Sequence, residues 1–396
     1  MAFDMTATFR SDLPPADGVW NAPPPYSFVG GHNDAASVPF AGLAEAAATA
    51  LSREGRNLAT YNLGGSPLGY LPLREHLASS LGARAAMPCA PDEILITSGS
   101  LQALDLVNAA MLEQGDTVLV EQATYGGMLS RLARHGVDVV GVDLDDGGLR
   151  VDALEATLDK LAAAGTTPKY LYTIPTVQNP TGSVMDLDRR RALLDVARRR
   201  SLPIFEDECY ADLTWGTSRP PTLRALDDGG GHVIYCGSFS KSIAPALRVG
   251  YIVADEPVLR QLLAMKTDAG TGALEQLTLA EFAPRHFDAH VAQLTSTLQA
   301  KCEVMVGALR EHFGDRVEII EPQGGIYVWV SFPPGTDTTA LAPAAAAAGI
   351  EFNPGAGWSA DPDDGRRRLR LCFGHPDHDT IRAGVAALAA LMAEAA

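Results

Sequence analysis

Lys241 is the residue of this chain whose surroundings most clearly suggest chemistry. It lies in the segment GSFSKSIAPALRVG, directly after an apolar run typical of a β-strand, with Ser238 and Ser240 before it and Arg248 after it. A lysine at the end of such a strand faces the crevice where open α/β sheets bind ligands. Hydroxyl groups and an arginine suit a phosphate group. A desolvated lysine near other cations has a lowered pKa and can form a Schiff base with a carbonyl compound.

A solvated loop lysine is the alternative interpretation of Lys241, and the other lysines of the chain have that kind of context. They lie in charged, helix-like segments, and we expect all four at the surface: Lys160, Lys169, Lys266 and Lys301. Two arginine triplets, at 189–191 and 198–200, are likewise expected on the solvated face of a helix.

Two further segments could serve the same site. The segment SGS at 98–100 lies between a strand-like run and a helix-like segment, where free backbone N–H groups and the helix dipole favour a phosphate. A plain serine cap is the alternative for Ser100. Asp207 ends another apolar run, within FEDECY. Glu206 and Glu208 alternate with Asp207 along that strand, so we expect them to point to the opposite face.

The elements that must position these residues predict an α/β fold. Seven short runs rich in Val, Ile, Leu and Tyr alternate with helix-length segments, which is typical of a mostly parallel sheet between helices. Only nine residues separate Phe239 from Val249, too few for a helical crossover, so the last strand should pair antiparallel or lie at an edge. The seven runs are Ile94–Thr97, Thr117–Glu121, Asp138–Val142, Tyr170–Pro175, Pro203–Asp207, Val233–Gly237 and Val249–Ala254.

The C-terminal third has a different character. Two long helices are predicted at 255–283 and 285–313, followed by short strands and an alanine-rich helix near 339–348. This pattern indicates a smaller α+β domain. We therefore expect three parts: an N-terminal arm at 1–40 that joins the small domain, a large cofactor-binding domain at 41–282, and the C-terminal small domain at 283–396.

The overall composition disfavours several classes of protein. The chain has 31 basic and 48 acidic residues and a net charge of −17, which opposes binding to nucleic acids and anionic membranes. No apolar stretch resembles a signal peptide or a membrane-spanning helix. The five cysteines are widely spaced without a CxxC pair. We therefore predict no metal site and no disulfide framework, and a reduced, cytoplasmic protein.

Three motifs, in order along the chain, resemble those of one enzyme family. SFSKxxAPxLRxG around Lys241 is similar to the cofactor-lysine motif of the fold-type I pyridoxal phosphate (PLP) enzymes of the class I/II aminotransferase family. LYTIPTVQNPTG at 171–182 and FEDECY at 205–210 are similar to two further stretches of that family. The resemblance extends from about Tyr61 to Phe373 and implies that PLP is bound to Lys241 as a Schiff base.

The resemblance also implies which residues hold the cofactor ring. Asp207 is implied to keep the pyridine nitrogen protonated, which lets the ring accept electrons. Tyr210 and Asn179 are implied to hydrogen-bond the phenolic oxygen, and Tyr125 to stack on the ring. The Asn-Pro peptide bond after Asn179 is a candidate for a cis peptide.

Other residues are implied to bind the cofactor phosphate and the substrate. Tyr61 resembles the tyrosine that reaches the phosphate of the neighbouring subunit, which implies a homodimer with shared active sites. Arg370, in LRLCF, resembles the arginine that binds the substrate α-carboxylate. Asn179, Gly31 and His32 are further candidates for substrate binding. The phosphate is implied to lie among Gly99, Ser100, Leu101, Ser238, Ser240 and Arg248.

The segment FVGGHNDAASVP departs from the family pattern. Relatives more often have Gly-Gly-x-Pro there, whereas His32, Asn33 and Asp34 place polar, titratable groups near the expected substrate pocket. An Asn-Asp turn without a function is the alternative. Gly374 stands where serine or asparagine is common after Arg370. These differences bear on the substrate and the reaction rather than on cofactor binding.

The implied activity is transfer of an amino group from an amino acid to a 2-oxo acid, with Lys241 carrying a proton between the substrate and the cofactor. The alternative is elimination, replacement or cyclisation by a PLP enzyme of the same fold. A third candidate is the effector domain of a transcriptional regulator, because some regulators carry an aminotransferase-like domain. That function needs an added basic DNA-binding module, which we do not find before residue 41.

Overall fold

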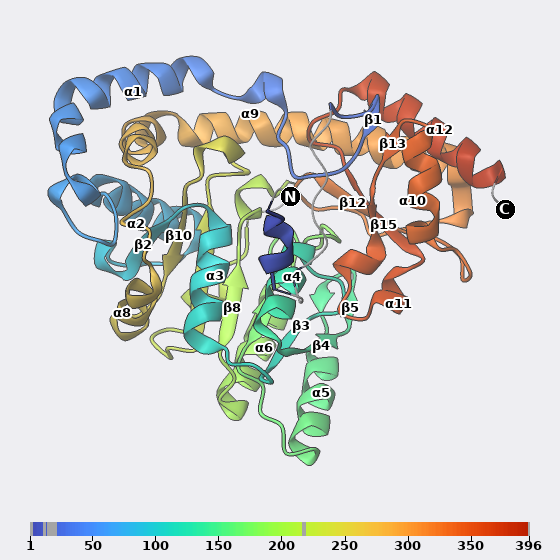
Figure 1. The fold of residues 1–396 in the computed structure, drawn as a ribbon, viewed down its shortest axis with the longest axis horizontal. Coiled ribbons are helices and arrows are strands. Elements are labelled where there is room, and N and C mark those ends of the chain that lie inside the picture. Colours follow the sequence, from blue (N-terminus) through green and yellow to red (C-terminus); the bar gives the residue numbers. More distant parts are fainter. Residues whose placement is uncertain (1–2, 11–12, 14–21, 216–218, 395–396) are drawn as a thin grey trace.

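A sheet of seven strands dominates the computed structural model, which describes residues 3–10, 13, 22–215 and 219–394 (Figure 1). The strand order is β2-β10-β9-β8-β7-β3-β4, and every neighbouring pair is parallel except the two that involve β10. The seven predicted runs and the mostly parallel sheet are therefore confirmed. The strands are β2 (Ile94–Thr97), β3 (Thr117–Glu121), β4 (Asp138–Val142), β7 (Leu171–Thr173), β8 (Ile204–Asp207), β9 (Val233–Ser238) and β10 (Gly250–Val253).

Strand β10 lies second in the sheet and not at its edge. Gly250 of β10 pairs with Ser238 of β9, so the chain reverses within a short turn. The prediction of antiparallel pairing is confirmed, and the alternative of an edge strand is wrong. Lys241 and Arg248 both lie in this turn. The short connection therefore brings them together at the end of the sheet where the parallel strands finish.

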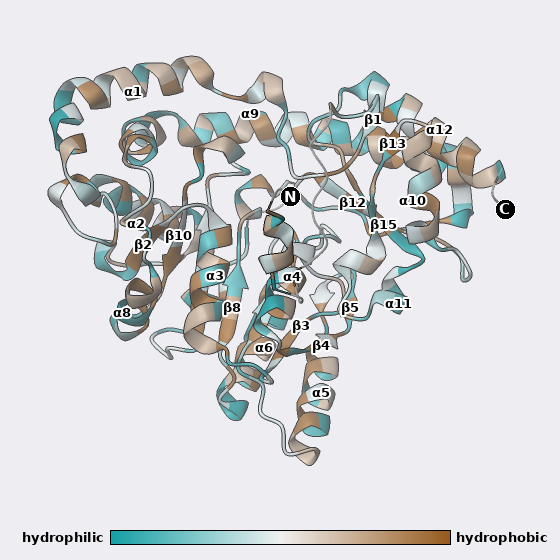
Figure 2. Ribbon diagram, viewed as in Figure 1, coloured by the Kyte–Doolittle hydropathy of each residue, from teal (hydrophilic) through white to brown (hydrophobic). Residues whose placement is uncertain are grey.

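Helices cover both faces of the sheet because neighbouring side chains of a strand point to opposite faces. Leu95 of β2 belongs to the apolar cluster on one face, whereas Ile94 and Ile96 belong to a cluster on the other. In Figure 2 strands such as β8 are largely brown, whereas helices such as α1 and α9 carry both brown and teal residues. The first face is covered by α3 (Ser100–Met111), α4 (Gly126–His135) and α8 (Glu256–Met265). The second is covered by α2 (Leu71–Ala85), α5 (Val151–Ala163), α6 (Leu187–Arg200) and α7 (Leu223–Leu226).

Helix α9 (Ala273–Phe313) runs from the sheet to the C-terminal part as one continuous helix, orange in Figure 1. The predicted break at Pro284 is wrong. A proline removes one hydrogen bond from a helix, but Phe282 and Phe287 on either side are buried, and this packing outweighs the local preference. The domain boundary expected at 282/283 therefore falls inside a helix. Neither α9 nor any other described helix is apolar enough to cross a membrane.

A four-stranded sheet in the order β11-β12-β15-β14 forms the C-terminal part. Its core also contains Phe28 from the N-terminal segment, where β1 pairs with β13. Segments from both ends of the chain thus share one core, while α1 packs along α9 (Figure 1). The elements are β1 (Tyr26–Ser27), α1 (Phe40–Glu54), β11 (Glu318–Ile319), β12 (Tyr327–Ser331), α10 (Thr338–Ala347), β13 (Ile350–Glu351), β14 (Asn353–Pro354), α11 (Pro362–Gly365), β15 (Arg368–Cys372) and α12 (His378–Glu394).

Arg190 contradicts the expectation that the arginine triplets lie on a solvated face. Its side chain is 0% exposed and donates two hydrogen bonds of 2.9 Å to backbone carbonyl oxygens. The guanidinium also lies 3.5 Å from Glu208 and 3.9 Å from Glu206. The cause is its position three and seven residues before the buried Leu193 and Ala197, which places all three on one face of α6.

Replacing Arg190 with methionine should strongly destabilise the fold, because the buried Glu206 loses its nearby cation and two buried carbonyl oxygens lose their donor, while Glu208 keeps only Arg219 at 3.0 Å. We expect the free energy of unfolding to fall by about 3–5 kcal/mol, measured by urea denaturation followed by circular dichroism. The matched control is Arg191→Met, since the Arg191 side chain is 60% exposed. It should change the same quantity by less than about 0.5 kcal/mol. Equal effects of the two substitutions would refute the inferred role of Arg190.

Candidate active site

A cavity of about 500 Å³ lies at the edge of the sheet where the parallel strands end. Its walls come from segments far apart in sequence, because parallel strands that share a direction deliver their carboxyl ends to the same edge. Strands β12 and β15 of the C-terminal part supply the remaining wall. Most of the predicted site residues line the cavity: Gly31, Ser100, Leu101, Tyr125, Asn179, Asp207, Tyr210, Ser240, Lys241, Arg248 and Arg370.

Lys241 places its amine in this cavity. Nζ donates a hydrogen bond of 2.5 Å to the carbonyl oxygen of Gly31 and lies 5.7 Å from the centroid of the Tyr210 ring. Burial lowers the pKa of the Lys241 ammonium to about 8, and the charges of Arg370 and Arg248 contribute to the lowering. An amine with this pKa is partly uncharged near neutral pH, so it can attack a carbonyl carbon or carry a proton.

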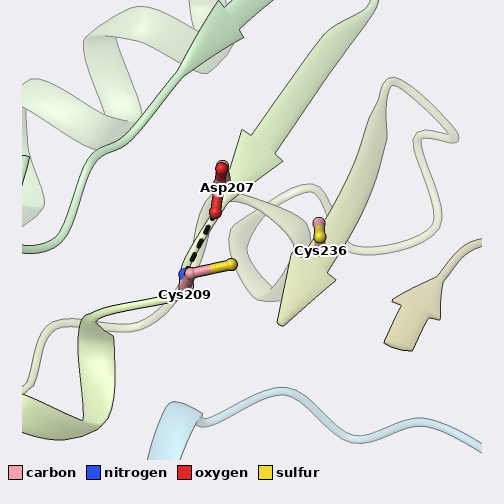
Figure 3. A group of neighbouring side chains, drawn as sticks. All are labelled: Asp207, Cys209 and Cys236. Atoms are coloured by element: carbon pink, nitrogen blue, oxygen red, sulfur yellow. Dashed lines mark hydrogen bonds between the residues drawn. The ribbon is translucent and has the colours of Figure 1, made fainter. Parts of the chain in front are cut away.

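Asp207, the last residue of β8, is only 5% exposed. One carboxylate oxygen accepts a hydrogen bond of 2.7 Å from the Tyr172 hydroxyl, and the other accepts one of 3.1 Å from the backbone N–H of Cys209 (Figure 3). Burial raises the pKa of the Asp207 carboxyl. Among the described residues it forms no ion pair, so a protonated ring nitrogen is a fitting partner for its charge.

Glu206 and Glu208, the two alternatives to Asp207, face away from the cavity. Glu206 accepts hydrogen bonds from the backbone N–H groups that begin α7, the closest at 2.6 Å from Leu223. Glu208 accepts a hydrogen bond of 2.6 Å from Thr176. Neither is among the described residues that line the cavity, as the alternation along the strand predicted.

A second group of residues forms a donor set suited to a phosphate. Helix α3 begins at Ser100, so the N–H groups of its first turn lack helical partners. Ser238 Oγ lies 3.0 Å from Ser240 Oγ, and Arg248 Nη1 lies 3.4 Å from the same Ser240 oxygen. Gly99 has a φ of 75°, and a side chain there would collide with the Arg248 guanidinium. The close approach of Arg248 to the start of α3 therefore requires glycine at this position.

Arg370, on β15, is 2% exposed and contacts two aromatic rings. Its guanidinium carbon lies 3.8 Å from the centroid of Tyr327 and 3.4 Å from that of Trp358. It donates hydrogen bonds to the side-chain oxygens of Asn179, at 3.1 Å, and Asn353, at 2.8 Å. Its Nε is buried and has no partner among the described residues. A planar guanidinium held in this way can bind a carboxylate.

Tyr210, Asn179 and Tyr125 line the same cavity from three different loops. The Tyr210 hydroxyl lies 3.0 Å from that of Tyr327, and burial raises the pKa of the Tyr210 phenol. The peptide bond after Asn179 is trans, so the cis alternative is wrong.

Four predicted site residues lie outside the cavity lining: Gly99, Ser238, Tyr61 and His32. Tyr61 is 81% exposed, and its predicted contact with a neighbouring subunit stays a prediction. His32 lies beside His375, with ring centroids 6.0 Å apart. Burial lowers the pKa of His32, as do the nearby His375 and Lys241. His32 therefore sits close to the site without being among the residues that line it.

Eight residues that the sequence did not predict also line the cavity, among them Tyr327, Asn353 and Trp358. Tyr327 lies within GGIYVWV, which reads as an ordinary apolar strand. Asn353 and Trp358 flank the turn sequence PGAG, which marks a loop but gives no indication of its neighbours. Only the pairing of β12 and β14 with β15 brings these side chains to Arg370.

Asp207, Cys209 and Cys236 form a cluster that the sequence did not predict (Figure 3). One ligand atom of each lies within 4.8 Å of the others, a spacing that a metal ion could bridge. A metal requires deprotonated thiols. A hydrogen bond to Cys236 and burial raise the pKa of Cys209 far above its ordinary value. The cluster therefore fits neutral thiols beside Asp207 better than a metal centre.

Glu121, at the end of β3, is a buried acid that does not line the cavity but hydrogen-bonds the loop before Asn179. It is 0% exposed and accepts hydrogen bonds of 2.7 Å from the Thr173 hydroxyl and 2.9 Å from the Gln178 amide. Gln178 directly precedes Asn179, so Glu121 holds the loop that carries Asn179. Burial raises the pKa of the Glu121 carboxyl to about 7.

The stability of the protein should therefore depend on Glu121 between pH 4.5 and 7. The pKa of Glu121 in the folded state lies above the ordinary value of 4.5. Between these two pH values the folded state therefore binds more protons than the unfolded state, and the free energy of unfolding falls as the pH rises. By linkage, Glu121 should lower the free energy of unfolding by on the order of 3 kcal/mol across this range. Urea denaturation of Glu121→Gln at several pH values should show a correspondingly smaller decrease. The exposed Glu113→Gln should keep the wild-type slope, and an unchanged slope in Glu121→Gln would contradict the assignment.

Comparison with known proteins relates this geometry to a family. The model of the family described as aminotransferase class I and II matches residues 33–388. Aromatic-amino-acid aminotransferase 1 of Thermococcus litoralis is 34% identical to this chain over 333 residues, which are 83% of this chain and 79% of that protein. An uncharacterised HTH-type transcriptional regulator of Bacillus subtilis is 33% identical over 83% of this chain and 67% of the regulator.

A solved structure gives the same relationship in three dimensions. The crystal structure of the α-aminoadipate aminotransferase LysN of Thermus thermophilus contains N-(5'-phosphopyridoxyl)-L-leucine. It superimposes with a TM-score of 0.85 at 33% identity, covering 93% of this chain and 92% of that one. The family match extends over most of the chain and includes all segments that build the cavity except the one with Gly30 and Gly31. This chain belongs to the class I and II aminotransferase family.

Proposed function

We propose that this chain moves an amino group from an amino acid to a 2-oxo acid, with pyridoxal phosphate bound to Lys241 as a Schiff base. The observation that carries the proposal is the meeting of Lys241, Asp207 and Arg370 around one cavity in a chain of this family. These residues supply an amine of lowered pKa, a buried carboxylate and a carboxylate-binding guanidinium.

The cofactor would be held at both of its ends. Ser100, Ser240 and Arg248 offer donors to its phosphate, with Ser238 behind them, and Asp207 holds a proton on its ring nitrogen. When bound, the cofactor withdraws electrons from the substrate α-carbon and so makes the α-proton removable. The donor set and the buried acid fit a phosphorylated, cationic ring.

The chain's own residues carry the remaining steps. Arg370 binds the substrate α-carboxylate and thereby orients the α-carbon. Once the substrate amine had replaced the Lys241 amine on the cofactor, Lys241, with its pKa of about 8, would take the proton from the α-carbon and would return it on the cofactor side. The cavity wall also contains Tyr327 and Trp358, which favours a substrate with an apolar or aromatic side chain.

The polar segment His32–Asp34 could serve elimination or replacement chemistry only if its side chains reached the cavity. None of these three residues is among the described residues that line the cavity. Asn33 and Asp34 instead make hydrogen bonds to the backbone of Lys241 and to Lys301. These contacts support transamination over the alternative reactions.

The proposed function can be tested by the need for an acceptor. The PLP-loaded protein is incubated with a panel of amino acids, with and without 2-oxoglutarate or pyruvate. We expect an aromatic or apolar amino acid to convert the Schiff-base absorbance to that of the aminated cofactor without an acceptor, and continuous turnover only when an acceptor is added. Lys241→Ala should lose both signals, whereas Lys169→Ala should keep them. Continuous product formation without an acceptor would contradict transamination.

We also propose that the active enzyme is a homodimer with shared sites. Large exposed apolar side chains gather in the segment that contains Tyr61, including Phe40 at 77% and Leu71 at 47% exposure. Such exposure favours a protein interface. Asn62 and Leu63, next to Tyr61, have φ values of 53° and 55°, a conformation that side chains rarely adopt without support. A neighbouring subunit would cover this surface and bring Tyr61 to the other subunit's phosphate.

Mixing two damaged chains tests whether the sites are shared. Lys241→Ala chains and Tyr61→Phe chains are denatured together and refolded, so that mixed dimers form. One of the two sites in each mixed dimer then has an intact Lys241 from one chain and an intact Tyr61 from the other. We expect that site to regain wild-type affinity for the cofactor, measured by its absorbance during titration. A mixed dimer that shows only the sum of the two parents would place Tyr61 in its own chain's site.

A further inference from the structure

The segment His32–Asp34 ties the backbone of Lys241 to helix α9. Asn33 is 6% exposed, and its amide nitrogen donates hydrogen bonds of 3.0 Å to the carbonyl oxygen of Lys241 and 3.4 Å to that of Ser240. The next residue, Asp34, accepts a hydrogen bond of 2.8 Å from Lys301 Nζ. Two consecutive side chains thus contact the reactive lysine segment and a cation on α9.

Lys301 corrects the expectation that it lies at the surface. It is 5% exposed, and besides Asp34 its ammonium donates hydrogen bonds of 2.9 Å to the carbonyl oxygen of Gly374 and 3.4 Å to that of His375. These two residues follow β15, the strand that carries Arg370. The Lys301 ammonium therefore contacts segment 32–34, which hydrogen-bonds the backbone of Lys241. It also contacts residues 374–375, which follow the strand that carries Arg370.

The close packing of these segments explains Gly374. A side chain at this position would lie within 2.5 Å of the carbonyl oxygen of His32 and would force the two segments apart. Serine or asparagine, which are common here in relatives, would not fit this arrangement. The glycine and the Asp34–Lys301 pair are thus two parts of one contact.

We propose that Asp34 and Lys301 are positioning residues that fix the reactive amine of Lys241 relative to the guanidinium of Arg370. The inference rests on the proposed transamination, in which the substrate carboxylate binds Arg370 while its α-carbon must meet Lys241. A displacement of about 1 Å between reacting groups can lower the rate on the order of a hundredfold. A buried ion pair with additional hydrogen bonds has one preferred geometry, because removing either charge leaves the other unpaired in a poorly solvated place.

The first test removes the cation and keeps most of the length of its side chain. Lys301→Met is compared with Lys169→Met, whose lysine is 42% exposed and lies 3.4 Å from Asp116. In the PLP-loaded proteins we expect faster backbone hydrogen exchange at residues 238–243 and 372–376 in Lys301→Met and at neither in Lys169→Met. The pH titration of the Schiff-base absorbance should also shift, and kcat/KM should fall by at least about tenfold. Wild-type exchange at 238–243 together with an unshifted titration in Lys301→Met would overturn the inference.

A double variant separates an effect on the position of Lys241 from an effect on stability. Asp34→Asn combined with Lys301→Met leaves no buried charge unpaired, so its melting temperature should return toward that of the wild type. If the pair positions Lys241, the shifted titration and the lowered kcat/KM should persist in this double variant. Recovery of all three quantities would mean that the pair serves stability alone.

Asn33→Ala is a milder substitution. It tests whether segment 32–34 positions Lys241 even if Lys301→Met does not fold. It removes only the hydrogen bonds to Ser240 and Lys241, so it should shift the Schiff-base titration without a large change in melting temperature. An unshifted titration would overturn the inference. Hydrogen exchange and titration do not depend on the reaction catalysed. A failure of the proposed transamination would therefore appear in the acceptor test and leave these two readouts unchanged.

Discussion

Repulsion between cations is the physical constraint on which this site depends. Lys241, Arg248 and Arg370 line one cavity, and the two guanidinium charges help to lower the pKa of the lysine. Three like charges around a small volume would move apart unless each were held by its own surroundings. Arg248 is held by carbonyl oxygens, including that of Pro245 at 3.0 Å, and Arg370 by amide oxygens and aromatic rings. The amine is reactive because burial, with a contribution from the two guanidinium charges, lowers its pKa.

The cations belong to different parts of the chain, so the fold must hold those parts in a fixed relationship. Lys241 and Arg248 lie at the sheet edge, whereas Arg370 lies on a strand of the C-terminal part. Helix α9 spans both parts without a break (Figure 1), and Lys301 in its C-terminal half contacts Asp34, next to the residue that hydrogen-bonds the Lys241 backbone, and Gly374, just after the strand of Arg370. A continuous helix transmits position well because its backbone hydrogen bonds resist bending. A flexible linker at this place would leave the separation of the reacting groups undefined.

The relatives of this chain show that its fold does not by itself decide the activity. An aminotransferase and a transcriptional regulator match it at nearly the same identity. What favours an enzyme here is the chemistry at the strand ends, where a buried carboxylate, a lysine of lowered pKa and a phosphate-binding set surround one cavity. Function on a widely used fold is carried by such sites.

The sequence by itself determined the seven strands, the antiparallel turn around Lys241 and the motifs that identify the family, because these depend on local periodicity and short spacing. The tertiary structure decided which charged residues are buried and what they contact. Arg190 and Lys301 look like surface residues in sequence, yet both are buried: Arg190 lies near Glu206 and Glu208, and Lys301 pairs with Asp34. Trp358 lies in an ordinary loop sequence, yet its ring contacts Arg370. Pro284 looks like a helix end but lies within α9. In these cases burial and packing outweigh the preference of the local segment.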